Sequence, residues 1–209
     1  ILPQANDDGE TIVAISTPPG VGGIGVVRVS GPSAASIASE LLGDVPATRT
    51  AKFRRFRDEQ HNAIDEGLAL FFEAPNSYTG EDVLELHGHG GALVLDLLVE
   101  RVFRLGARAA RPGEFTERAF LNGKLDLAQA EAVADLIASR TQAAARAAMR
   151  SLSGAFSTEL NAIEDKLAEL RAYVEADIDF SDEDIEGLAS VTIKGRLVSI
   201  RGDLNKLLD

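Results

Sequence analysis

The chain changes character near Leu125, and this change constrains the fold more than any other feature of the sequence. Before Leu125, short runs rich in β-branched residues alternate with turns that contain Gly and Pro; after it, Ala, Leu, Glu and Arg dominate and Pro is absent. The first pattern is typical of strands and the second favours helices. The sequence therefore predicts two domains, an α+β domain over 1–124 and an α-helical bundle domain over 125–209.

The front domain is predicted to hold a mixed sheet with flanking helices. The hydrophobic runs predict strands over 11–16, 24–30, 67–73 and 82–87, and helices over 32–42, 92–105 and 114–122. A glycine-rich loop over 20–25 is expected between the first two strands. Gly43 and Gly106 are expected to end helices, because glycine adopts the left-handed conformation that helix ends require.

The back domain is predicted to be all helix, with a first helix over 127–140. Two later runs repeat apolar residues at intervals of four and three, which places one narrow apolar stripe on each helix. The stripes are Phe156, Leu160, Ile163, Leu167, Leu170 and Val174, and Ile193, Leu197, Ile200, Leu204 and Leu207. We expect these helices to pack on each other. Since two stripes make a thin core, we expect an incomplete bundle that needs further helices.

Composition excludes several classes of protein. The 209 residues include no Cys, so a disulfide framework, a thiol nucleophile and a thiolate metal site are all excluded. The net charge of −12 is unlike the basic surface of most duplex-binding proteins, so a nucleic-acid contact would need a local patch. Two basic stretches are interpreted as a solvated strand and a solvated helix face. They are Arg49, Lys52, Arg54, Arg55 and Arg57, and Arg101, Arg104, Arg108, Arg111 and Arg118.

The sequence offers no sign of a membrane or export segment. Residues 3–10 are largely polar, and no run of about 18 apolar residues occurs. We therefore expect a cytoplasmic protein without a membrane partner.

Two glycine motifs bear on nucleotide binding. Gly20, Gly22 and Gly25 match the dinucleotide fingerprint as text, but a Val-rich strand follows where that fingerprint needs a helix. We interpret the segment as a backbone-rich loop that can approach a ligand closely. Gly123 and Lys124 lack the flanking residues of a P-loop, so this chain is expected to have no GTPase activity of its own.

Two clusters are candidate metal sites. Glu85, His87 and His89 alternate along a strand end and could share one face, but Gly88, Gly90 and Gly91 indicate a turn there. An acidic run lacks the Gly and Glu that an EF-hand requires, and it is interpreted as a solvated loop between helices. Its members are Asp177, Asp179, Asp182, Glu183, Asp184 and Glu186. No metal site and no catalytic residue is assigned.

Three segments resemble the MnmE (TrmE) family of tRNA-modifying GTPases. They are 11–31 (TIVAISTPPGVGGIGVVRVSG), 75–91 (PNSYTGEDVLELHGHGG) and 110–132 (ARPGEFTERAFLNGKLDLAQAEA). The likeness runs from about residue 11 to the end of the chain, in the family's order and spacing.

The resemblance implies a tetrahydrofolate-binding, dimerising front domain, similar to the folate domains of aminomethyltransferases, followed by the first half of a helical domain. In this family a Ras-like G domain, inserted into the helical domain, hydrolyses GTP with Mg²⁺ and K⁺. With a flavoprotein partner of the MnmG type, the protein modifies carbon 5 of the wobble uridine of certain tRNAs. We expect a homodimer, and we expect this chain to stop about where the G domain starts.

The resemblance also implies that Arg28, Glu85 and Lys124 contact 5-formyltetrahydrofolate or a related reduced folate. A carboxylate such as Glu85 can accept hydrogen bonds from the amine and the ring N–H of a pterin. The glutamate tail is anionic and suits Arg28 or Lys124, and this choice stays open. A stand-alone folate-binding one-carbon transfer protein and a structural dimerisation scaffold are the alternative functions.

Overall fold

A computed structural model describes residues 9–179 and 186–208, and the chain divides into two compact units, Ile1–Leu125 and Asp126–Asp209. Unit 1 contains a six-stranded sheet in the order β3-β4-β5-β2-β1-β6. Neighbouring strands are antiparallel except β1 and β6, which are parallel, so the predicted mixed sheet is confirmed. The strands are β1 (Ile12–Ile15), β2 (Gly22–Ser30), β3 (Lys52–Arg57), β4 (Ala63–Phe72), β5 (Val83–Gly90) and β6 (Arg108–Ala109).

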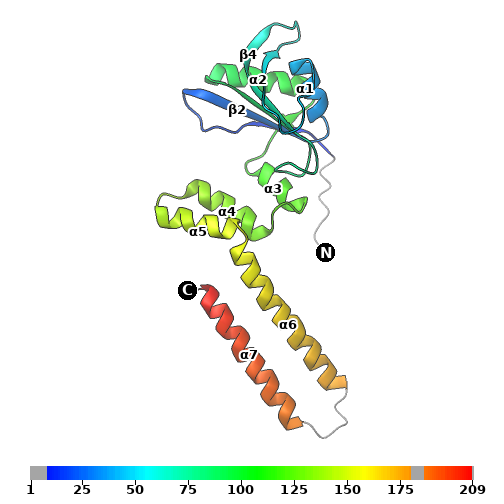
Figure 1. The fold of residues 1–209 in the computed structure, drawn as a ribbon, viewed down its shortest axis with the longest axis vertical. Helices are drawn as coiled ribbons and strands as arrows, with labels where there is room; N and C mark the ends of the chain where they lie inside the picture. The colour runs from blue at the N-terminus through cyan, green and yellow to red at the C-terminus, as the bar shows by residue number, and fades with distance from the viewer. Residues whose placement is uncertain (1–8, 180–185, 209) are drawn as a thin grey trace. The chain divides into compact units, whose positions relative to one another are not determined.

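Three helices accompany this sheet (Figure 1): α1 (Ala34–Leu42), α2 (Ala92–Arg104) and α3 (Glu114–Leu121). Helices α1 and α2 pack on one face, because alternate strand residues such as Val27, Val29 and Leu86 point into a common core with them. Gly43 ends α1 in the left-handed conformation, as predicted. The intervening strand residues lie on the opposite face of the sheet and are available for a site.

Glycines in the two central strands, β2 and β5, serve close packing. The loop predicted over 20–25 is wrong in its second part, because β2 already begins at Gly22. A Cβ on Gly25 would lie 2.6 Å from Cδ1 of Leu95, so glycine there lets α2 approach the sheet. The turn predicted at Gly88 and Gly90 is also wrong, since β5 continues to Gly90. A Cβ on Gly90 would lie 2.6 Å from the carbonyl oxygen of Gly22, so two strand backbones meet closely there.

Unit 2 consists of helices α4 (Leu127–Ala138), α5 (Gln142–Leu152), α6 (Ala155–Asp179) and α7 (Glu186–Leu208). The helix predicted over 127–140 ends at Ala138, and α5 is a separate helix. Each of these two helices has its own cap: Asp126 and Gln129 form a capping box on α4, and the Thr141 hydroxyl accepts from the Ala144 N–H of α5. Among the described residues, no helix combines the length and apolar composition that a bilayer crossing requires.

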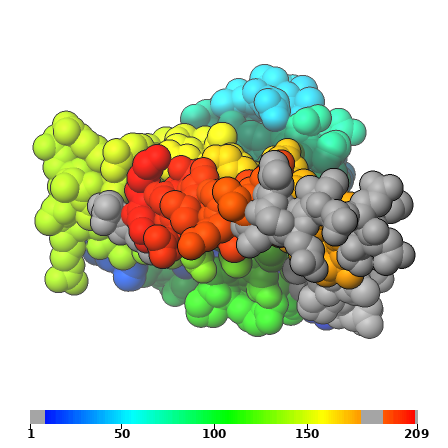
Figure 2. All heavy atoms as spheres, turned by 90° about the horizontal axis from the view of Figure 1, so that it is seen from below, coloured from blue at the N-terminus to red at the C-terminus, as the bar shows by residue number. Residues whose placement is uncertain are grey.

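Helices α6 and α7 lie side by side (Figure 1), and the space-filling view shows the outer surface of α7 in orange to red (Figure 2). Ile163 and Leu170 of α6 are buried together with Ile200 of α7, which confirms that the two stripes pack on each other. Other members of the stripes stay exposed, including Leu167 at 44% and Leu197 at 49%. The pairing therefore covers only part of each stripe.

The acidic run was predicted to lie in a loop, and this is wrong for its first two members and for its last, Glu186, which begins α7. Asp177 lies within α6, and Asp179 is the last residue of that helix. Asp182, Glu183 and Asp184 lie outside the described residues.

Candidate functional site

The face of the sheet opposite α1 and α2 carries an ion pair between two of the predicted site residues. Arg28 of β2 and Glu85 of β5 are register partners in adjacent strands. Nε of Arg28 lies 2.9 Å from Oε1 of Glu85, and Nη2 lies 2.8 Å from the same oxygen. Both side chains are partly buried, at 28% and 15% exposure. Cross-strand pairing thus brings together two residues that are far apart in the sequence.

Two aromatic rings flank the Arg28 guanidinium. Its Cζ lies 5.5 Å from the ring centre of Tyr78 and 5.7 Å from that of Phe115, within the range of a cation–π contact. Tyr78 belongs to the loop between β4 and β5, and its hydroxyl lies 2.9 Å from Oγ1 of Thr116 in α3. Sheet, loop and α3 therefore converge on Arg28. Neither aromatic was predicted as a site residue, although both lie in segments that carry the family resemblance.

Two histidines of β5 pair with different carboxylates. Nε2 of His87 lies 3.1 Å from Oε2 of Glu85, whereas Nδ1 of His89 lies 2.7 Å from Oδ1 of Asp65 in β4. The hydrogen bond with Asp65 raises the pKa of His89 above its ordinary value. In the part of the chain that the structure describes, no three His, Cys, Asp or Glu side chains gather as metal ligands.

Lys124, the third predicted site residue, contacts the same loop but not the ion pair. Its Nζ donates to the carbonyl oxygen of Pro75 at 3.0 Å. A Cβ on Gly80 would lie 3.3 Å from Cγ of Lys124, so the stem of the lysine crosses this glycine. The loop that places Tyr78 against Arg28 thus also holds Lys124. The structure brings Arg28 and Glu85 into direct contact and connects Lys124 to them through the loop.

A buried carboxylate, Glu114, anchors the start of α3. It is fully buried, and Nη2 and Nη1 of Arg108 donate to its two oxygens at 2.6 and 2.9 Å. The Arg111 N–H and the Arg118 guanidinium also donate to it, at 2.7 and 3.2 Å. These hydrogen bonds, that of Arg108 first, lower the pKa of Glu114 to about 2 against the effect of burial. Glu114 therefore stays ionised and fixes the helix that presents Phe115.

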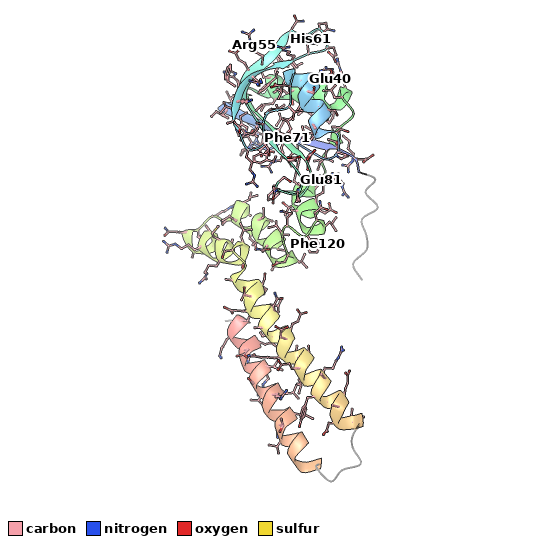
Figure 3. The ribbon with its side chains drawn as sticks, turned by 45° about the vertical axis from the view of Figure 1, so that its right-hand side comes forward. Glu40, Arg55, His61, Phe71, Glu81 and Phe120 are labelled. Carbon is pink, nitrogen blue, oxygen red and sulfur yellow. The ribbon has the colours of Figure 1, made fainter. Side chains whose placement is uncertain are left out.

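Arg118 extends this network to the sheet. Its Nη1 donates to Oε1 of Glu81 at 3.0 Å and to the carbonyl oxygen of Glu10 at 2.8 Å. Glu81, labelled between the sheet and α3 in Figure 3, also accepts from the Ser30 hydroxyl of β2 at 2.7 Å. The network therefore ties α3 and the loop to the strand that carries Arg28.

The interpretation of the second basic stretch as a solvated helix face is wrong for Arg101 and Arg118, whereas Arg104 and Arg111 are 56% and 62% exposed. The Arg118 side chain is 7% exposed and that of Arg101 is 10% exposed. Carboxylates from distant segments, such as Glu59 for Arg101, draw these arginines inward, which a charge pattern along the chain cannot show. The first stretch does form a strand, β3.

Comparison with protein families matches both units. The family model described as "GTP-binding protein TrmE N-terminus" covers residues 11–124, and the "MnmE helical domain" model covers residues 127–209. The chain belongs to the MnmE (TrmE) family. The family resemblance found in the sequence is thereby confirmed.

Curated members of the MnmE family are similar over nearly the whole chain. Proteins named tRNA modification GTPase MnmE from Methylococcus capsulatus and Azoarcus sp. are 55% and 58% identical to it, over 98% and 96% of its length. The protein of the same name from Proteus mirabilis is 55% identical over 94%. The matched parts make up 46%, 44% and 43% of these relatives, so the chain spans less than half of their length.

Proposed function

We propose that the chain is the N-terminal part of a tRNA modification GTPase and that unit 1 binds a reduced folate such as 5-formyltetrahydrofolate. One observation carries the folate proposal: a partly buried carboxylate, Glu85, is held by Arg28 on an open sheet face beside the rings of Tyr78 and Phe115. A pterin is a flat ring with adjacent N–H donors, and this arrangement offers it an acceptor beside aromatic surface.

The donor set around Glu85 fits this ligand. Glu85 accepts from Arg28 through Oε1 and contacts His87 through Oε2. A carboxylate offers about four lone-pair sites, so it can still accept from a pterin. Arg28 then acts as the residue that orients Glu85 and balances its charge. When bound, the folate would supply the one-carbon unit, while these side chains bind and orient it.

The structure supports a choice for the anionic tail. The Arg28 guanidinium is already paired with Glu85, whereas Lys124 is exposed and its ammonium contacts only a backbone carbonyl among the hydrogen bonds described for it. An exposed ammonium group can reorient toward a carboxylate at little cost. We therefore assign the glutamate tail to Lys124.

The remaining properties are proposed for the whole protein. Its G domain would hydrolyse GTP with Mg²⁺ and K⁺, and with a flavoprotein partner it would modify the wobble uridine of tRNA. Homodimerisation through unit 1 has support in exposed apolar side chains on the sheet. Phe53 and Leu68 are cross-strand partners with 61% and 44% exposure, and Ile24 is 69% exposed.

The test is a calorimetric titration with 5-formyltetrahydrofolate. Glu85→Gln keeps the shape but replaces an acceptor with a group that is half donor. Loss of a charged partner costs about 2–5 kcal/mol, so we expect a dissociation constant roughly 30-fold higher or more. Glu66→Gln, on exposed β4 surface beside Arg55, is the matched control. Equal affinity of the two variants would show that Glu85 does not contact the pterin.

A second titration separates the tail from the ring. Lys124→Ala is expected to weaken 5-formyltetrahydrofolate more than a tetrahydropterin without the glutamate tail, because only the former carries the carboxylates. An equal loss of affinity for both ligands would show that Lys124 does not bind the glutamate tail.

A further inference from the structure

Helix α5 lies in the longest stretch of unit 2 that lacks acidic residues. Between Asp135 and Glu159 the sequence contains no Asp or Glu, but it contains Arg140, Arg146 and Arg150. The whole chain carries a net charge of −12. A locally positive segment in such a chain is the kind of patch that a polyanion could use.

Arg146 and Arg150 lie on the side of α5 that faces away from α4. Ala148 is buried, and the carbonyl oxygen of Leu152 accepts from Nε2 of Gln129 in α4, so this side of the helix meets α4. Arg146 and Arg150 each stand two positions from Ala148. Two residues turn a helix by about 200°. Both guanidinium groups therefore project from the opposite side of α5.

Arg146 and Arg150 form no ion pair with the other residues that the structure describes. Within 9–179 and 186–208, no ion pair or side-chain hydrogen bond engages the guanidinium of Arg146 or Arg150. Unit 1 provides a contrast, since its Arg101, Arg104 and Arg118 are all paired with carboxylates. The charge on α5 is thus fully available to a ligand.

The surface beside these arginines has a shallow depression that is formed by α5 alone. It is lined by Ala143, Arg146, Met149, Arg150 and Ser153, all from α5 or its C-cap. A depression with walls from a single helix cannot enclose a small molecule, but it can lie against an extended chain. Met149, at 52% exposure, is its one large apolar side chain, which is too little apolar surface for a stable protein interface.

We propose that the outward face of α5, centred on Arg146 and Arg150, binds the phosphate backbone of RNA. The inference rests on the proposed function, in which the RNA is the tRNA substrate. Guanidinium groups pair with phosphate oxygens through two parallel hydrogen bonds, and small Ala and Ser side chains between them let the backbone approach. The contact is to phosphate, so it positions the RNA without reading its sequence.

The test measures binding of an unmodified tRNA transcript to the 209-residue chain at several NaCl concentrations. In Arg146→Gln/Arg150→Gln, we expect the dissociation constant at low salt to rise on the order of tenfold. The slope of log K against log[NaCl] should fall by roughly 1.4–1.8, which is the loss of two phosphate contacts. Glutamine keeps helix propensity, and circular dichroism checks the fold. Lys194→Gln/Arg201→Gln on α7, which removes the same charge from exposed positions, is the matched control.

The outcomes separate the possible roles of α5. A larger loss in the α5 variant than in the α7 control supports the proposal. Equal behaviour of the two double variants, or wild-type chain that does not bind the transcript, overturns it. Unchanged tRNA affinity with loss of a flavoprotein partner would show a protein-docking face and also overturn it. A folate titration of the same variants keeps the proposed function separate, since α5 changes should leave it unaffected.

Discussion

The core of unit 1 and the α6–α7 pair of unit 2 are both built from apolar patterns, but they bury them to different degrees. In unit 1, side chains of strands β1 to β5 meet those of α1 and α2 in one continuous core, in which Leu84 and Leu98 are completely buried. In the α6–α7 pair, burial is confined to Ile163, Leu170 and Ile200, with Val174, Ile193 and Leu207 packed against them. Two helices share only a seam, whereas helices on a sheet share a surface.

The largest effect is expected from the unit 1 core. Leu98→Ala removes a completely buried side chain of α2 between the helix and the sheet, and should lower the free energy of unfolding by about 3–5 kcal/mol. Tyr78 lies in unit 1 and Tyr173 in α6, and the chain has no other tyrosine and no tryptophan. Urea unfolding followed by tyrosine fluorescence in a Tyr173→Phe background reports on unit 1. An unchanged urea midpoint for Leu98→Ala would contradict the view that unit 1 has the more completely buried core.

The next prediction concerns the buried carboxylate of Glu114, which anchors α3 in unit 1. Among the described residues, the α6–α7 pair has no buried carboxylate that corresponds to it. The pKa of Glu114 is lowered from 4.5 to about 2 in the folded chain. Its contribution to stability is present above pH 4.5 and is lost as the pH falls from there through 2. It amounts to about 3 kcal/mol at neutral pH.

Glu114→Gln should therefore destabilise unit 1 at pH 7 and flatten its stability profile between pH 4.5 and 2. Glu117→Gln, on the same helix but 49% exposed, is the control. Thermal unfolding at a series of pH values measures both variants. Parallel pH profiles of Glu114→Gln and wild type would mean that the buried carboxylate is not the titrating group.

The smallest effects compare two positions of the α6–α7 pair. Ile200→Ala removes a side chain that is 4% exposed and should cost about 2–3 kcal/mol. Leu167 belongs to the facing stripe but is 44% exposed, so Leu167→Ala should cost less than about 1 kcal/mol. Tyr173 fluorescence in a Tyr78→Phe background follows this pair, since Arg196 of α7 lies 5.0 Å from that ring. Equal losses of unfolding free energy for Ile200→Ala and Leu167→Ala would show that Leu167 is also buried between α6 and α7.

Much of the secondary structure was predictable because it depends on local chemistry. A Val-rich run predicted β2, and the heptad spacing predicted α6 and α7. The errors arose where one residue type can serve two structural roles, as glycine does in turns and in close packing. Gly25 and Gly90 were interpreted as loop or turn residues, but their role is close packing of backbone and helix, which depends on neighbours far along the chain. The division of α4 from α5 depended on Thr141, a capping residue that the sequence does contain.

For the candidate site, the sequence by itself supplied the family and, through that resemblance, the charged residues Arg28, Glu85 and Lys124. Their arrangement came from the tertiary structure, because strand register decides that Arg28 meets Glu85, and packing of the loop on α3 decides that Tyr78 and Phe115 flank the pair. The burial of Arg118 has the same origin. Glu114 is a local partner of Arg118, four residues before it on α3, but Glu81 and the Glu10 carbonyl come from distant segments that local sequence does not indicate.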